Sequence, residues 1–211
     1  MEITKYEHAC LDIRVGEQRL VVDPGEFTTS LTNFSNIDAV VITHVHGDHF
    51  DKEKLLKIIE LNPSIKIYST GEVSEQASEI KINVVDSGDS IELGDFNLKF
   101  YGKDHAEIDP KTPVAQNIGV LINNQLYYPG DSFTPCPEKF KILAVPASAP
   151  WLRVGQTIPL IEESDCEIVF PTHNALLSDI GHATTNNWLK KFSDRSNKKF
   201  EFLKPGESIQ I

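Results

Sequence analysis

Short apolar stretches, each closed by Gly, Pro, Asn or Asp, recur along the whole chain and predict β-strands. The predicted strands cover residues 9–15, 19–22, 40–42, 65–68, 82–85, 90–93, 96–101, 118–122, 125–128, 142–145, 168–170, 200–203 and 208–211. Apolar residues at helical spacing predict helices over 51–61, 72–80 and 157–163, and from Thr184 or Thr185 onward. Hairpins therefore alternate with strand–helix–strand crossovers. This order predicts an α/β (α+β) protein, with sheets packed face to face and helices outside them.

A histidine-rich segment directly follows one of these strands. The run Ala39–Ile42 is wholly apolar, as in a strand buried on both faces, and Thr43-His44-Val45-His46-Gly47-Asp48-His49 comes next. His44 and His46 project to the same side of an extended chain, and Gly47 permits a turn that re-aims Asp48 and His49. Imidazole nitrogen and carboxylate oxygen are ligands of zinc and its first-row neighbours. Four such ligands, pointing in two different directions, predict two adjacent metal ions.

Three further candidate ligands follow predicted strands later in the chain. His105 comes after 96–101, Asp131 after 125–128 and His173 after 168–170. Loops converge at the edge of a sheet, where a shared site can form. Taken alone, Asp131 also suits a turn after Pro129-Gly130. As an ordered set, the three residues favour one site together with the segment 43–49.

Length, charge and cysteine usage narrow the class of protein. The 211 residues fit a single domain over 1–211, built as one unit or from two similar halves. The net charge of −11 argues against a nucleic-acid partner and against an anionic membrane surface, so we expect a small-molecule substrate. The three cysteines, the polar N-terminus and the lack of a long apolar run predict a cytoplasmic protein without membrane insertion. The sequence leaves the oligomeric state open.

With these residues in view, the chain resembles the metallo-β-lactamase-fold superfamily of metal-dependent hydrolases. The match comprises His44-x-His46-x-Asp48-His49, then His105, Asp131 and His173, in the family's order. The resemblance implies a four-layer αβ/βα sandwich with a dinuclear site at the edge of the two central sheets. Class B β-lactamases usually have cysteine where Asp131 stands, so the chain resembles the broader hydrolase branch. Residues 113–119, 128–132 and 149–151 are most similar to the ascorbate-6-phosphate lactonase-like and N-acyl-phosphatidylethanolamine phospholipase D-like group.

The resemblance also implies a role for each ligand. One ion would be held by His44, His46 and His105, the other by Asp48, His49 and His173, and Asp131 would bridge them. We expect two divalent ions, zinc first, with manganese or iron as alternatives. A hydroxide shared by the ions would attack a small ester, lactone or phosphodiester. Asp48 would orient it, and a metal-bound water or His182 would protonate the leaving group. The alternatives are an RNA- or DNA-processing nuclease of the same superfamily and a metal-binding module without catalysis.

Several other residues have two interpretations. Trp151 and Arg153 lie in the loop after strand 142–145 and suit an apolar and an anionic part of a substrate, or else a core cap and a solvated charge. His182 could reach the substrate or cap a backbone group. Asp23 could orient a metal-bound histidine or simply form a turn. His8 is expected to be a structural histidine rather than a residue that supports a ligand.

Overall fold

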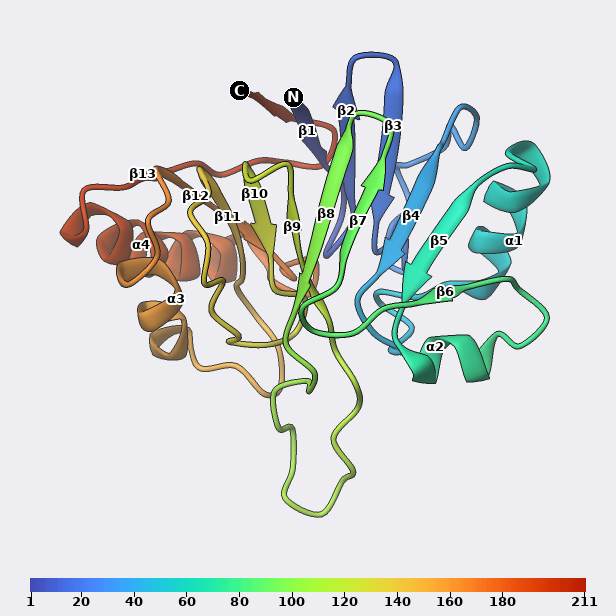
Figure 1. The fold of residues 1–211 in the computed structure, drawn as a ribbon. Helices are drawn as coiled ribbons and strands as arrows, with labels where there is room; N and C mark the ends of the chain where they lie inside the picture. Colours follow the sequence, from blue (N-terminus) through green and yellow to red (C-terminus); the bar gives the residue numbers. More distant parts are fainter.

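The computed structural model describes residues 1–211 and places two seven-stranded sheets between two groups of helices (Figure 1). The first sheet has the order β14 (Ser208–Gln210), β1 (Glu2–Lys5), β2 (Leu11–Val15), β3 (Gln18–Val22), β4 (Ala39–Ile42), β5 (Lys66–Ser69) and β6 (Asn83–Val84). The second has the order β7 (Ser90–Leu93), β8 (Phe96–Tyr101), β9 (Gly119–Ile122), β10 (Leu126–Tyr128), β11 (Ile142–Pro146), β12 (Ile168–Thr172) and β13 (Lys199–Phe200).

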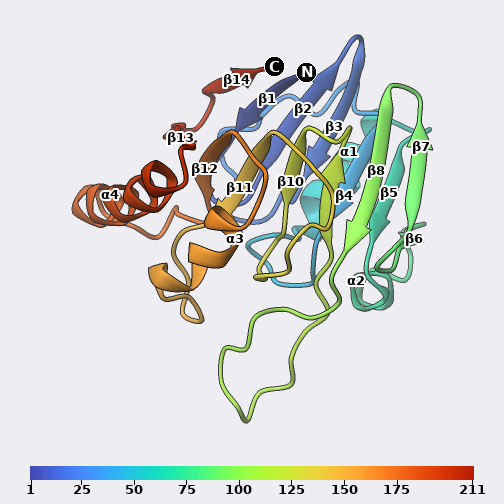
Figure 2. The same ribbon diagram turned by 60° about the vertical axis from the view of Figure 1, so that its left-hand side comes forward.

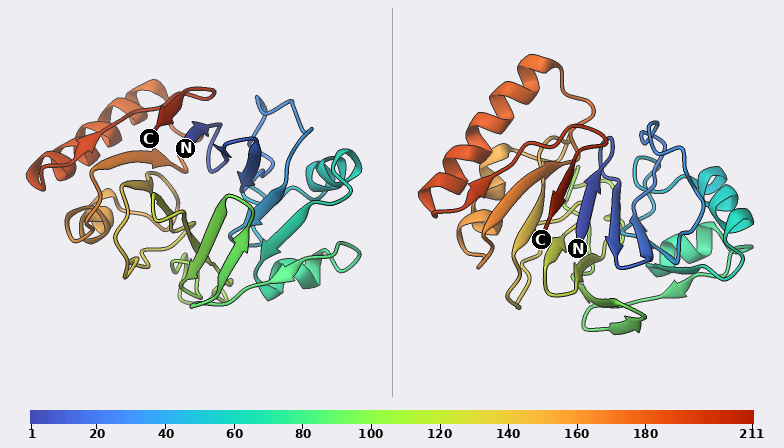
Figure 3. Two further views of the ribbon diagram at one scale, coloured as in Figure 1. Left: turned by 45° about the horizontal axis from the view of Figure 1, so that its top comes forward. Right: turned by 90° about the horizontal axis from the view of Figure 1, so that it is seen from above.

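The two sheets repeat one pattern of strand pairing. In the first sheet, β14 through β3 pair antiparallel, and β3 through β6 pair parallel. In the second, β7 through β10 pair antiparallel, and β10 through β13 pair parallel. The chain therefore contains two similar halves, although β14 crosses back to pair with β1. This pairing brings the two termini together at one end of the molecule (Figure 3).

Helices cover the outer face of each sheet. Helices α1 (Lys52–Leu61) and α2 (Gly71–Gln76) pack on the first sheet. The 3₁₀ turn η1 (Val154–Thr157), α3 (Ile158–Glu162) and α4 (Asp179–Arg195) lie beside the second. Figure 2 shows the same layers turned, with the loop between β8 and β9 projecting beyond them. The expected four-layer sandwich is confirmed.

The alternation of side chains along β4 explains the layers. Ala39 and Val41 point into the apolar core between the two sheets, while Val40 and Ile42 point into the core under α1 and α2. All four residues of β4 are buried because both faces of the strand are covered. The central core is the largest of the three apolar clusters and joins the two sheets.

The element boundaries depart from the sequence prediction in a few places. The strand β1 was not expected, and it exists because β2 and β14 flank it on both sides. Helix α4 begins at Asp179 and not near Thr184, because the Ser178 side chain caps it by accepting a hydrogen bond from the Gly181 amide. Helix α2 ends at Gln76, short of the predicted residue 80. None of the helices is both long enough and apolar enough to span a membrane.

Candidate metal centre

The topology brings the candidate ligands to one edge of the two sheets. Strands β8, β10 and β12 run in the same direction, because β9 lies antiparallel between β8 and β10 and the following strands are parallel. Their C-terminal ends therefore deliver His105, Asp131 and His173 to the same edge. The end of β4 delivers the segment 43–49 from the other sheet. The meeting of these strand ends forms the site.

The histidine-rich segment turns tightly before α1. The amides of His49 and Phe50 both donate to the carbonyl of His46, at 3.0 and 2.8 Å. The turn packs so closely on Gly25 that a Cβ atom there would lie 2.0 Å from the carbonyl oxygen of Asp48. Gly25 is therefore needed in the Asp23-Pro24-Gly25 turn because any side chain would displace the ligand segment.

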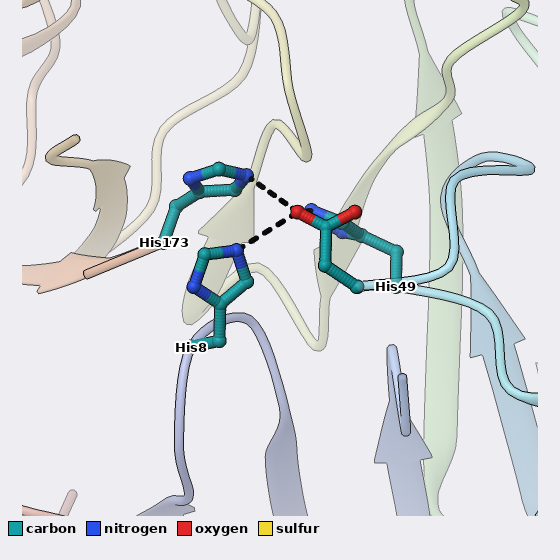
Figure 4. Close-up of side chains that lie close together, drawn as sticks. His8, His49 and His173 are labelled. Carbon is teal, nitrogen blue, oxygen red and sulfur yellow. Dashed lines mark hydrogen bonds and ion pairs between the residues drawn. The ribbon is translucent and has the colours of Figure 1, made fainter. Parts of the chain in front are cut away.

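All seven predicted ligands lie in one cluster. Potential ligand atoms of His44, His46 and His105 lie within 4.8 Å of one another, as do those of His44, His49 and Asp131. A third such group contains Asp48, His49 and His173, together with His8 (Figure 4). The Asp131 carboxylate lies between the groups, with Oδ1 3.2 Å from His49 Nε2 and Oδ2 2.9 Å from His173 Nε2 and 3.4 Å from His105 Nε2. This position suits a bridge, although the role of each side chain stays a prediction.

The histidines at the centre of the cluster are oriented by hydrogen bonds that their Nδ1 atoms make with groups on the side away from Asp131. Nδ1 of His105 lies 2.5 Å from the Ala106 carbonyl and Nδ1 of His173 lies 2.6 Å from the Ser148 carbonyl. A carbonyl only accepts, so Nδ1 carries the proton in both rings, and in the neutral ring Nε2 keeps a free lone pair. Nε2 of His49, His105 and His173 and Oδ1 of Asp131 are buried without a hydrogen-bond partner. Buried polar atoms rarely lack partners, so these converging atoms fit a bound cation.

Asp23 orients the ligand segment and not merely the turn that contains it. Its carboxylate accepts hydrogen bonds from the Thr43 amide and hydroxyl, both at 2.7 Å, and from the Tyr128 hydroxyl at 3.0 Å. Its Oδ2 also lies 2.7 Å from Nδ1 of His49. The carboxylate therefore fixes the ring of His49 with Nε2 directed toward Asp131. This contact supports the first of the two interpretations of Asp23.

The charges of the metal-free cluster compensate one another. Burial disfavours a proton on His49, but the carboxylates of Asp131 and Asp23 outweigh it and raise the pKa of His49 well above its usual value. Burial likewise opposes a charge on His173, yet Asp131 raises its pKa to about 9. The pKa of the buried Asp131 is in turn held well below its ordinary value by His49 and His173. A bound cation would replace these protons as the countercharge, so metal binding would release them.

The proposed substrate residues lie at different distances from the cluster. Trp151 is buried, and its ring centroid lies 5.4 Å from that of His105 and 5.9 Å from that of His173. Arg153 is exposed two residues further on. His182 packs on Phe202, at 5.6 Å between ring centroids, and lines a separate cavity of about 600 Å³ that His8 also borders. Trp151 thus contacts two histidines of the cluster, whereas His182 contacts Phe202 and shares a cavity with His8.

Two residues support the cluster although the sequence pattern did not predict it. Asn117 accepts a hydrogen bond from the Asp131 amide at 3.0 Å and donates to the Pro129 carbonyl at 2.9 Å, which holds the Asp131 loop. His8 lies with Nε2 3.0 Å from Oδ2 of Asp48. Asn117 belongs to no metal-ligand spacing and His8 stands far from the other ligands in sequence, so no local pattern identified them.

The chain is similar to known protein families and to individual proteins. The family model described as "Beta-lactamase superfamily domain" matches residues 2–173. Protein Rv0786c of Mycobacterium tuberculosis is 31% identical over 183 residues, covering 84% of this chain and 86% of that protein. A UPF0173 metal-dependent hydrolase of Flavobacterium johnsoniae is 26% identical over 235 residues and covers both chains completely.

Solved structures show the same fold at lower identity. The metallo hydrolase Igni18 of Ignicoccus hospitalis aligns with a TM-score of 0.75 and 18% identity, covering 99% of this chain and 97% of its own. The diiron β-hydroxylase CmlA of Streptomyces venezuelae aligns with a TM-score of 0.77 and 13% identity, covering all of this chain and 54% of its own. Proteins of this fold therefore include one named for iron, and the fold does not identify the metal.

Proposed function

The chain belongs to the beta-lactamase superfamily and is a metal-dependent hydrolase, and we propose that it cleaves a small ester, lactone or phosphodiester with two divalent ions held at the sheet edge. One observation carries the proposal. Four buried ligand atoms, on His49, His105, His173 and Asp131, converge on one another and have no hydrogen-bond partner outside the cluster. A purely structural cluster would have satisfied them, because an unpaired buried polar atom costs about 1–3 kcal/mol.

The residues would divide between the two ions as the family resemblance implies. His44, His46 and His105 would hold one ion, and Asp48, His49 and His173 the other, with Asp131 between them. When bound, two such ions lower the pKa of a water molecule toward about 7 and polarise the bond to be cleaved. Zinc suits the histidine-rich donor set best. Asp48 is the more open of the two carboxylates, with 21% of its side chain exposed against 2% for Asp131, so Asp48 is the one placed to orient or deprotonate the attacking water.

The surroundings of the cluster support a small substrate with an apolar part. Trp151 packs against His105 and His173 on one side and against Phe133 on the other, at 5.5 Å between ring centroids. The indole therefore borders the position where a substrate would meet the ions. Replacing Trp151 by Phe should raise KM by about tenfold while both ions stay bound, since a smaller ring loses apolar contact.

Two broader features of the protein are part of the proposal. Residues 1–211 act as a single domain, because the cluster draws on segments from His8 to His173 that belong to both sheets. The protein works in the cytoplasm, where its three free cysteines suit a reducing environment.

The test combines metal analysis with a substrate panel. Protein loaded with zinc, manganese or iron would be assayed on bis(p-nitrophenyl) phosphate, p-nitrophenyl acetate and a γ-lactone, with tRNA at low salt as the test for a nuclease. We expect about two ions per chain and hydrolysis of a small substrate that stops on chelation. Asp131→Ala is the matched inactive variant. Activity that survives complete chelation, or cleavage of tRNA alone, would refute the proposal.

A further inference from the structure

His8 enters the cluster from a part of the chain with no predicted ligand. It lies in the turn between β1 and β2 and is completely buried. Its Nε2 atom lies 3.0 Å from Oδ2 of Asp48, the same oxygen that lies 3.2 Å from Nε2 of His173 (Figure 4). The His8 ring also packs on the His173 ring, at 3.9 Å between centroids.

The hydrogen bonds of His8 define which nitrogen carries its proton. The Ala175 amide donates to Nδ1 of His8 at 3.3 Å, so Nδ1 is an acceptor and the hydrogen of the neutral ring is on Nε2. Nε2–H then donates to the Asp48 carboxylate. This is the reverse of His105 and His173, in which Nδ1 donates to a carbonyl and Nε2 faces the Asp131 carboxylate. The arrangement leaves His8 no lone pair directed at an ion.

The backbone of His8 is tied to His173 as well. The His173 amide donates to the His8 carbonyl at 2.8 Å. Both residues have positive φ, 59° for His8 and 53° for His173. Such a conformation costs a residue with a side chain about 1–2 kcal/mol, and it persists only where the surrounding contacts require it. Two residues with strained backbones, joined by a hydrogen bond, indicate that this contact fixes the directions of the His8 and His173 side chains.

We propose that His8 is a positioning residue, which holds Asp48 through its side chain and His173 through its backbone, and is not itself a metal ligand. The inference rests on the proposed function only in requiring that Asp48 and His173 bind an ion. By holding Oδ2 of Asp48, which also lies 3.9 Å from Nε2 of His49 and 3.2 Å from Nε2 of His173, His8 fixes this oxygen among the ligands of the second ion. Partners of this kind typically change metal affinity by about 10- to 100-fold.

The test measures zinc binding and not turnover. Wild type, His8→Ala and His8→Gln would be titrated with Zn²⁺ against a chromophoric chelator, with Ile180→Ala on the exposed start of α4 as the control. We expect His8→Ala to weaken one of two zinc sites by about 10- to 100-fold. His8→Gln should recover part of this loss, because its amide can donate to Asp48. The melting temperature of the metal-free variants reports any loss of folding separately.

A double-mutant cycle distinguishes a positioning role of His8 from a role as a metal ligand and from a purely structural role. In an Asp48→Ala background, His8→Ala should have little further effect on zinc affinity, since the acceptor is gone. A loss that persists in this background and that Gln fails to rescue would make His8 a ligand and overturn the proposal. Unchanged zinc affinity with a lower metal-free melting temperature would make it purely structural and also overturn it. Tight zinc binding without hydrolysis of any substrate would refute only the proposed function.

Discussion

Two buried groups of charged side chains in this protein differ in how they satisfy their hydrogen bonds. Arg19 and Asp12, on β3 and β2, are both buried and form a two-point ion pair at 3.0 and 2.7 Å. The remaining nitrogen of Arg19 donates to the Ser35 carbonyl, and Nη2 also donates to the Asn33 carbonyl. At the sheet edge, by contrast, four buried atoms of His49, His105, His173 and Asp131 face one another and have no hydrogen-bond partner outside their own group.

This contrast indicates that the Arg19–Asp12 pair is structural and that the sheet-edge cluster is functional. A buried ion pair with every nitrogen engaged is self-sufficient, and it ties the loop of residues 33–35 to the first sheet. The sheet-edge cluster is complete only if something else fills its centre. Burial and charge are common to both groups, so neither marks a site by itself. What marks the site is that its ligand atoms converge on one another without a partner outside the cluster.

Breaking the satisfied pair should have the largest effect on folding. Asp12→Ala would leave the Arg19 guanidinium buried without its countercharge, which typically costs about 3–5 kcal/mol of unfolding free energy. Zinc affinity of the folded variant should not change. Urea unfolding measures the first quantity and chelator competition the second. The exposed pair Lys190–Asp194 provides the control, since Lys190→Ala should change stability by less than about 1 kcal/mol. A loss of zinc affinity in Asp12→Ala would contradict the distinction.

The sheet-edge cluster should respond in the opposite way. His46 is half-buried, and its Nδ1 lies 3.1 Å from Nε2 of His44. His46→Ala should weaken the first zinc site by at least about 100-fold, beyond the effect of losing a supporting partner. The metal-free protein should lose no more than about 1 kcal/mol of stability. Chelator competition measures the zinc affinity, and urea unfolding measures the stability of the metal-free protein. A variant that unfolds more readily yet keeps both zinc ions would reverse the assignment.

Lys5 is an intermediate case that sharpens the comparison. It is buried and donates to the Tyr6 carbonyl at 2.8 Å and to Asn174 Oδ1 at 3.2 Å, but not to a carboxylate. Burial lowers the pKa of Lys5 from the usual lysine value of 10.5 to about 8. Between these pH values the unfolded chain binds more protons than the folded one, so the contribution of Lys5 to stability rises with pH.

A substitution at Lys5 isolates this contribution. The stability of Lys5→Met relative to wild type should fall by about 2 kcal/mol between pH 7 and pH 10, as wild type loses the cost of the buried charge. Urea unfolding of both proteins at the two pH values measures the change, because the other titrations cancel in the difference. If the difference between the two proteins stays constant, the two hydrogen bonds compensate the charge fully and Lys5 belongs with Arg19.

The smallest effect is expected at the exposed rim. The side chain of Arg153 is exposed. Its backbone pairs with Gln156, because the amide donates to Oε1 and the carbonyl accepts from the Gln156 amide, both at 2.7 Å. Arg153→Ala should raise KM about three- to fivefold for a substrate that carries a phosphate, within the range of a surface ion pair of up to about 1 kcal/mol. KM for a neutral lactone should not change. Steady-state kinetics on the matched substrates decides, and equal changes for both would show that Arg153 does not recognise charge.

Local sequence was sufficient for most of the fold and for the centre of the site. The apolar run of β4 and the histidines that follow it are adjacent in the chain, so their proximity needs no tertiary information. Helix α4 shows the limit of such reasoning. Its first turn carries Ile180, which is 80% exposed, so helical spacing of apolar residues appears only further along. The capping serine at residue 178 was the remaining local signal.

The sequence by itself determined which residues could bind metal, because ligand chemistry and the order of ligands after strands are written along the chain. Only the tertiary structure decided which atoms face the centre. That choice depends on carbonyls from distant segments, such as Ser148 behind His173, and on Asp23 behind His49. The tertiary structure also placed His8 against Asp48, which is 40 residues away in the sequence. Hydrogen bonds between segments far apart in the chain have no sequence periodicity, so they become visible only when the sheets have packed together.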